Sequence, residues 1–434
     1  MKVLKFGGTS VGSAQRMKEV AKLITDGEQK IVVLSAMSGT TNTLVEISDY
    51  LYKKNPEGAN EIINKLEAKY KQHVDELYAT QEYKQKGLEV IKSHFDYIRS
   101  YTKDLFTLFE EKVVLAQGEL ISTAMVNFYL QECGVKSVLL PALEFMRTDK
   151  NAEPDPVYIK DKLRAQLDLY PDTEIYITQG FICRNAYGEI DNLQRGGSDY
   201  TASLIGAAVN ASEIQIWTDI DGMHNNDPRI VDKTAPVRQL HFEEAAELAY
   251  FGAKILHPTC IQPAKYANIP VRLLNTMDPD APGTLISNDT EKGKIKAVAA
   301  KNNITASRML LAHGFLRKVF EIFESYQTSI DMICTSEVGV SVTIDNTKHL
   351  NEILDDLKKY GTVTVDKDMC IICVVGDLEW ENVGFEAKAL DAMRDIPVRM
   401  ISFGGSNYNI SFLIRECDKK IALQSLSDML FNNK

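Results

Sequence analysis

Short apolar runs alternate with stretches of helical periodicity through the first two thirds of the chain. Val3, Leu4 and Phe6 form the first run, and apolar positions recur at helical spacing from Ser13 onward. The further apolar runs are KIVVLSAM, VKSVLL, TEIYITQGF and ASEIQIWTDIDG, with helical stretches such as SDYTASLIGAAV between them. Apolar strands that alternate with helices predict an α/β domain with a mostly parallel central sheet flanked by helices.

A long segment without strand signals interrupts this alternation. Residues 51–111 are charged, rich in aromatic side chains and nearly free of glycine and proline. This composition predicts a helical subdomain within the α/β domain.

The last third of the chain is organised differently. Turn-forming residues concentrate between Asp278 and Gly293 and indicate a domain boundary. Beyond it, the stretches SIDMICTSEVGVSVTI and PVRMISFGGSNYNISFLI are similar to each other, and helical patterns precede and follow both. We therefore expect a first domain at 1–293 and two tandem βαββα units at 294–369 and 370–434.

Composition narrows the possible partners. The 434 residues are 44% hydrophobic and 25% charged, as in globular domains, and the formal net charge is −11. An acidic chain is poorly suited to nonspecific binding of nucleic acid or anionic membranes. We find no signal-peptide pattern and no apolar run long enough to span a bilayer, and we expect a cytoplasmic protein. Cys370 and Cys373, on opposite faces of the expected strand MCIICVVG, predict buried thiols and no shared metal.

The end of the first expected strand has chemistry suited to an anion. Lys5 precedes Gly7 and Gly8, and two hydroxyl residues, Thr9 and Ser10, follow before the first helix. Glycines let the backbone approach a ligand closely, and a helix start offers unpaired N–H groups. A tight turn with an exposed lysine would have the same pattern, so this motif alone indicates only an anion near a helix start.

Four other stretches place polar residues near expected strand ends. QGEL puts Glu119 at the start of an expected helix, and in QRGGSDYT two glycines separate Arg195 from Ser198 and Asp199. WTDIDGMHNNDPR and FGAKILHP contribute further acids, an arginine and Lys254. Each has an ordinary structural explanation, such as a helix N-cap, a turn or a solvated charge. Together, cations, backbone amides and carboxylates at strand ends predict phosphoryl transfer.

The order of these motifs carries a family resemblance. KFGGTSVG, VLSAMSGTTN, GELIST, RGGSDYTA, WTDIDGMHNNDPR and FGAKILHP occur in the order found in aspartokinases of the amino-acid kinase family. The C-terminal repeat resembles the paired ACT domains of those enzymes, so the resemblance covers essentially the whole chain. It implies transfer of the γ-phosphoryl group of MgATP to the side-chain carboxylate of L-aspartate, the first step of lysine, threonine and methionine biosynthesis. A carboxylate acceptor is already ionised at neutral pH and needs no general base.

The resemblance also implies site residues, position by position. The catalytic set is Lys5, Asp199 and Lys254, with Mg²⁺ carried by ATP and no dedicated protein metal site. The ATP-binding set is Lys5, Gly7, Gly8, Ser10, Thr218, Asp219, His224, Asp227, Arg229 and Lys254. The aspartate-binding set is Ser35, Thr41, Glu119, Phe181, Arg195 and Ser198. Arg195 would pair with the α-carboxylate as a bidentate fork, and Glu119 with the α-ammonium group. The family usually has tyrosine where this chain has His224.

The stretch MLLAHGFLRKVFEIFESYQTSIDMICTSEVGVSVTID resembles the first ACT domain of lysine-sensitive aspartokinases. The implied site for an L-lysine effector is Met309, Gly314, Phe315, Leu316, Ser329, Ile330, Asp331, Thr335, Ser336 and Glu337. Asp331 and Glu337 would bind an ammonium group; without the resemblance they would be two solvated acids at a strand end. Ala312 and His313 replace the serine and arginine of familiar lysine-sensitive members. An exposed ACT sheet edge predicts a homodimer through this region.

Two other functions fit part of the pattern. A sibling amino-acid kinase would phosphorylate glutamate, acetylglutamate or a nucleotide monophosphate, although the paired ACT-like units and RGGSDYTA favour an aspartokinase. A catalytically silent amino-acid sensor would be favoured by the loss of Lys5, Asp199 or Lys254, and all three are present.

Overall fold

The computed structural model describes residues 1–103, 105–193, 196–252, 256–311 and 315–431. The chain divides into two compact units. The first unit contains Met1–Gly222 and Leu256–Asn288, and the second contains Met223–Ile255 and Asp289–Lys434. The second unit thus includes 223–255, a segment that the sequence-based division assigns to the first domain.

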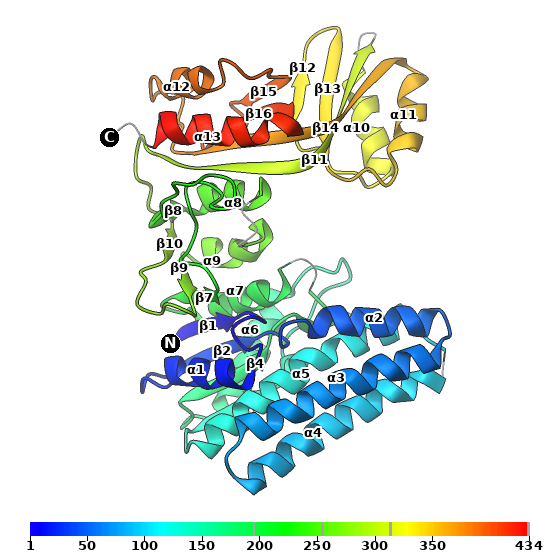
Figure 1. Cartoon of the computed structure of the whole chain (residues 1–434), viewed down its shortest axis with the longest axis vertical. Helices are drawn as coiled ribbons and strands as arrows, with labels where there is room; N and C mark the ends of the chain where they lie inside the picture. Colours follow the sequence, from blue (N-terminus) through cyan, green and yellow to red (C-terminus); the bar gives the residue numbers. More distant parts are fainter. Residues whose placement is uncertain (104, 194–195, 253–255, 312–314, 432–434) are drawn as a thin grey trace. The chain divides into compact units, whose positions relative to one another are not determined.

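The first unit has α/β architecture (Figure 1). Its strands are β1 (Lys2–Phe6), β2 (Lys30–Leu34), β3 (Ser137–Leu140), β4 (Ile175–Gln179), β5 (Ile182–Arg184), β6 (Ile190–Asn192), β7 (Ile214–Thr218), β9 (Val271–Asn275) and β10 (Thr284–Ser287). Its helices are α1 (Ala14–Ile24), α2 (Thr40–Tyr52), α3 (Pro56–Leu77), α4 (Gln81–Ser100), α5 (Leu108–Glu132), α6 (Pro156–Asp168), α7 (Gly197–Val209) and α9 (Gln262–Tyr266).

The central sheet of this unit confirms the predicted parallel arrangement. Its strands lie in the order β3-β4-β2-β1-β7-β9-β10, and every neighbouring pair from β3 to β9 is parallel. The apolar side chains of β1 and β2 are buried because helices cover both faces of the sheet, which explains their nearly continuous hydrophobic runs. The carboxyl ends of β1, β2, β4 and β7 lie along one edge, where ligands of such sheets bind.

Helices α2 to α5 pack side by side (Figure 1) and share a core with β1 and β2. Helix α5 corrects one expectation from the sequence, because it begins at Leu108 and Glu119 lies in its middle. The start of the helix is set by Thr107 and Glu110, which form a reciprocal capping box. By length and apolar composition α5 could cross a membrane, but 72% of that stretch is buried, as in the core helix of a folded domain.

The second unit contains one antiparallel sheet with helices packed on it (Figure 1). The strands β11 (Ile295–Leu311), β12 (Ile333–Thr335), β13 (Gly339–Ile344), β14 (Gly361–Gly376), β15 (Met400–Phe403) and β16 (Asn409–Arg415) form this sheet. The unit also contains the short strand β8 (Gln239–His241). Its helices are α8 (Phe242–Tyr250), α10 (Leu316–Ser325), α11 (Leu350–Lys358), α12 (Phe385–Ala392) and α13 (Lys419–Leu430).

The repeat predicted from the sequence is confirmed in this unit. The order helix, two strands, helix occurs first as α10-β12-β13-α11 and again as α12-β15-β16-α13, and each copy has its own hydrophobic core. The two copies share the sheet order β12-β13-β11-β14-β16-β15, because the long strands β11 and β14 run through both. Strand β14 therefore continues across the boundary expected at residue 370. Cys370 and Cys373 lie on β14 as buried free thiols.

Candidate active site

Lys5 and Asp199 form an ion pair at the carboxyl edge of the parallel sheet. Lys5 lies near the end of β1, and Asp199 lies in the first turn of α7. The Lys5 Nζ atom is 2.7 Å from Asp199 Oδ1, and the two side chains are only 13% and 14% exposed. Helix α7 starts after Gly196, whose φ of +72° favours glycine. Asp199 is the acidic residue of the first turn of this helix.

The two glycine-rich turns after β1 and β2 contact each other. The Ser38 amide donates to the Gly8 carbonyl oxygen at 3.1 Å, and a Cβ atom on Gly8 would lie 2.9 Å from the Ala36 carbonyl oxygen. Glycine is therefore required at position 8 by the close approach of the second turn. The hydroxyl of Ser10 lies 2.8 Å from that of Thr276, a buried residue that the sequence analysis did not select.

The serines of the expected aspartate pocket also meet. Ser35 follows β2 directly, and its hydroxyl donates to the Ser198 hydroxyl at 3.0 Å. Phe181, which follows β4, has φ +68°, a conformation unfavourable for a bulky side chain. The hydroxyl of Thr201 in α7 accepts from the Phe181 amide at 3.0 Å and stabilises this backbone. Backbone strain at Phe181, where the chain after β4 contacts helix α7, is typical of a functional site.

Glu119 lies in α5 behind the second glycine turn and is 3% exposed. Its Oε1 atom accepts from the Ala36 amide at 3.2 Å, while Oε2 is buried without a hydrogen-bond partner among the described residues. Burial raises the pKa of Glu119 to about 7. One turn further along α5, the Ser122 hydroxyl donates to the Ser35 carbonyl oxygen at 2.8 Å. A buried, unpaired carboxyl group beside these turns is suited to receive a ligand cation.

The expected nucleotide residues belong to different units. In the first unit, Thr218 ends β7 and its hydroxyl donates to Asp219 at 3.2 Å. In the second unit, the Arg229 guanidinium lies 2.8 Å from Asp227 and holds the pKa of that carboxyl below its usual value. His224 is half-buried, with its Nδ1 atom 3.1 Å from the Thr234 hydroxyl. Arg195 and Lys254 lie outside the described residues.

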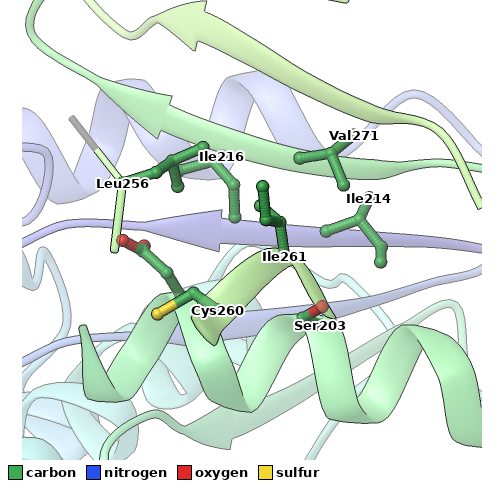
Figure 2. A pocket seen from close by; sticks show the side chains of 8 residues that line it. Ser203, Ile214, Ile216, Leu256, Cys260, Ile261 and Val271 are labelled. Atoms are coloured by element: carbon green, nitrogen blue, oxygen red, sulfur yellow. The ribbon is translucent and has the colours of Figure 1, made fainter. Parts of the chain in front are cut away.

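A small pocket lies between α7 and the strands β7 and β9 (Figure 2). It is lined by Asp199, Ser203, Ile214, Ile216, Leu256, Cys260, Ile261 and Val271. Its mostly apolar walls do not suit a polyphosphate. Cys260 packs so tightly there that a Cβ atom on Gly196 would lie 2.3 Å from its sulfur, which explains one glycine of the RGGSDYTA motif.

The expected effector residues are distributed around the first regulatory core. Met309 is buried in that core, while Thr335, the last residue of β12, and the following Ser336 and Glu337 are exposed. Gly314, Ala312 and His313 lie outside the described residues. The side chain of Asp331 is 1% exposed, and its Oδ1 atom lies 2.6 Å from Lys301 Nζ and 2.8 Å from the Tyr250 hydroxyl. The sequence analysis missed Lys301 and Tyr250, because no local motif marks them.

Comparison with known proteins agrees with this fold. Residues 1–275 match the model of the amino acid kinase family, and residues 372–430 match an ACT domain model. Aspartokinase 1, chloroplastic, of Arabidopsis thaliana is 36% identical over 464 residues, which cover 99% of this chain and 80% of the relative. Lysine-sensitive aspartokinase 3 of Escherichia coli (strain K12) is 32% identical over 447 residues, which cover 99% of both.

Two solved structures of E. coli aspartokinase III are similar at 31% identity. The complex with aspartate and ADP (R-state) has a TM-score of 0.87 and covers 99% of this chain and 100% of that one. The complex with lysine and aspartate (T-state) has a TM-score of 0.81 and covers 99% of each. The chain belongs to the amino acid kinase family. Its relatives across the full length place it among the aspartokinases of that family, which are ATP-dependent kinases with ACT regulatory domains.

Proposed function

We propose that this chain transfers the γ-phosphoryl group of ATP to the β-carboxylate of L-aspartate, giving 4-phospho-L-aspartate and ADP. The observation that carries the proposal is the Lys5–Asp199 ion pair, which lies beside two touching glycine turns at the carboxyl edge of a parallel sheet. A lysine next to close-packed backbone amides is the arrangement that neutralises and cradles transferring phosphate.

The reaction requires charge neutralisation more than proton transfer. An oxygen of the aspartate β-carboxylate attacks the γ-phosphorus, the bond from phosphorus to the β–γ bridging oxygen breaks, and ADP leaves with that electron pair. No proton moves, because the acceptor is ionised at neutral pH. Lys5 offsets the negative charge of the approaching groups, Asp199 orients Lys5, and Gly7, Gly8 and Ser10 bring backbone and hydroxyl donors to the phosphates.

The acceptor and the nucleotide bind through different side chains in this proposal. Glu119 receives the α-ammonium group of aspartate, because its free Oε2 atom has no other partner among the described residues. Arg195 binds the α-carboxylate, and Ser35, Thr41, Phe181 and Ser198 complete the pocket. Lys254, Thr218, Asp219, His224, Asp227 and Arg229 bind ATP, by resemblance to the family.

Magnesium enters as MgATP in this mechanism. Among the described residues, no three histidine, cysteine, aspartate or glutamate side chains are grouped to hold a metal ion. In this proposal the phosphates of ATP supply most of its ligands, and Asp199 is the nearest acidic side chain to Lys5. The bound ion would offset further phosphate charge.

We also propose that L-lysine inhibits the enzyme through the first ACT copy, where Asp331 supplies a buried carboxylate. One relative is named lysine-sensitive, and E. coli aspartokinase III has been crystallised with lysine, which supports this effector. A cytoplasmic homodimer paired through the exposed ACT edges completes the proposal.

Formation of aspartyl hydroxamate with ATP and hydroxylamine tests the function. We expect aspartate-dependent product that L-lysine suppresses and that Lys5→Ala abolishes. Lys2→Ala is the matched control, because Lys2 lies on the same strand but pairs at 2.9 Å with the exposed Glu28. Product with glutamate, acetylglutamate or a nucleotide monophosphate instead of aspartate would identify a sibling kinase. Lysine binding without any phosphorylation would indicate a silent sensor.

A further inference from the structure

A buried hydrogen bond connects the helical subdomain to the second glycine turn. The Tyr70 hydroxyl, from α3, lies 2.8 Å from the Thr40 hydroxyl, and both residues are 1% exposed. Thr40 is the first residue of α2, directly after the turn of residues 35–39. The N-cap of α2 is Gly39, which makes no side-chain cap, so the Thr40–Tyr70 bond is a side-chain anchor at this helix start.

The turn of residues 35–39 is also held from β1, the first glycine turn, α3, α5 and α7. The Gly8 carbonyl binds the Ser38 amide, Glu119 binds the Ala36 amide, and Ser122 binds the Ser35 carbonyl. Gly118 lies against the same turn, since a Cβ atom there would approach the Ala36 Cβ to 2.8 Å and the Thr40 Cγ2 to 3.1 Å. At the far end of the turn, Tyr70 holds Thr40 through a buried hydroxyl pair, while the neighbouring Lys69 donates to the Ser38 carbonyl oxygen at 3.4 Å from an exposed position.

The charge of Glu119 also acts on Tyr70. Burial and the nearby charge of Glu119 both raise the pKa of Tyr70 above its ordinary value. Its ring packs against Phe95 of α4 with the ring centres 5.8 Å apart, so its position is set by the helical subdomain. A shift of Tyr70 would displace Thr40 relative to Glu119, which lies on the other side of the same turn.

We propose that Tyr70 is a positioning residue for the aspartate side of the active site. Its hydroxyl holds Thr40, and through Thr40 it fixes Ser35, Ala36 and Thr41 at the spacing from Glu119 that aspartate requires. This assigns the helical subdomain, residues 51–111, a role in binding aspartate, although none of the expected site residues lies in it. The inference rests on the proposed function.

The test compares Tyr70→Phe, Thr40→Val and the double variant with wild type, measuring KM for aspartate and for ATP separately. Tyr70→Phe keeps the ring and removes one hydrogen bond, so we expect the KM for aspartate to rise about three- to tenfold with the KM for ATP unchanged. The double variant should show no further rise than the larger single effect, because both changes break the same bond.

Tyr78→Phe is the matched control. Tyr78 is 3% exposed in the same subdomain, and its hydroxyl donates to the Met125 carbonyl at 2.8 Å, away from the glycine turns. We expect this variant to lose thermal stability without changing either KM. Three results would overturn this inference without affecting the proposed function. They are an equal rise of the KM for aspartate in Tyr78→Phe, a parallel rise of the KM for ATP in Tyr70→Phe, and an unchanged KM for aspartate in Tyr70→Phe. Absence of aspartate saturation in the wild type would overturn the proposed function as well.

Discussion

Two lysine–aspartate pairs, one in each unit, have similar lengths but different surroundings. In the first unit, Lys5 is 2.7 Å from Asp199 and has no other acidic partner among the described residues. In the second, Lys301 is 2.6 Å from Asp331 and 3.0 Å from a second acid, Asp345. The Lys301 ammonium also lies 4.1 Å from the centre of the Tyr250 ring, a cation–π contact.

The difference indicates two uses for the same ion pair. Lys5 keeps bonding capacity for an incoming anion, because one carboxylate uses only part of the capacity of an ammonium group. Lys301 is satisfied by two carboxylates and a ring, and so it holds the first ACT copy to the end of α8. Burial raises the pKa of Asp331 and the Lys301 ammonium opposes that rise, so Lys301 stabilises the charged form of Asp331.

We expect the largest effect when the first ion pair, Lys5–Asp199, is broken. Asp199→Asn should lower kcat by about 10²-fold, because Lys5 loses the carboxylate that orients it toward the transferring phosphate. Asp331→Asn should leave kcat without lysine within about twofold and abolish inhibition by lysine. Steady-state rates with a coupled ADP assay measure both variants, and equal losses of kcat would contradict the comparison.

Glu119, a buried acid that pairs with no lysine among the described residues, sharpens the comparison. Glu119, with a pKa of about 7, must be ionised to bind an ammonium group, so the KM for aspartate should fall by up to about tenfold between pH 6 and pH 8. The folded-state pKa exceeds the unfolded value of 4.5, so without ligand the free energy of unfolding should decrease as pH rises from 5 to 7.5. Glu119→Gln should remove both pH dependences; their persistence would assign them to another group.

The smallest expected effect concerns the second pair. In Lys301→Met, Asp331 no longer has an internal ammonium partner, so an effector ammonium group meets no competitor. We expect the lysine concentration for half inhibition to fall about three- to tenfold. Lys296→Met is the control, because Lys296 lies on the same strand β11, is 6% exposed and pairs with Glu291. An equal shift in the control, or none in Lys301→Met, would contradict competition at Asp331.

Local patterns allowed much of the fold to be predicted. The strand, glycine turn and helix around Lys5 depend on neighbouring residues, and Ser13 caps the first helix by accepting from the Arg16 amide. The repeat in the second unit could be predicted because the two copies bury apolar side chains at corresponding positions, such as Met332 and Met400, or Val342 and Ile410. The prediction for Glu119 was wrong about its helix, because a short polar motif within an apolar helix resembled a helix start while Thr107 caps the helix far upstream.

The sequence by itself determined the alternation of strands and helices, the order of the motifs and the residues able to neutralise phosphate. Only the tertiary structure decided that Lys301 and Tyr250 bind Asp331, that Tyr70 anchors Thr40, and that β11 and β14 join the two ACT copies. These contacts join residues far apart in the chain. Their partners are selected by which polar groups must be satisfied once packing has removed them from water, and no local pattern records that requirement.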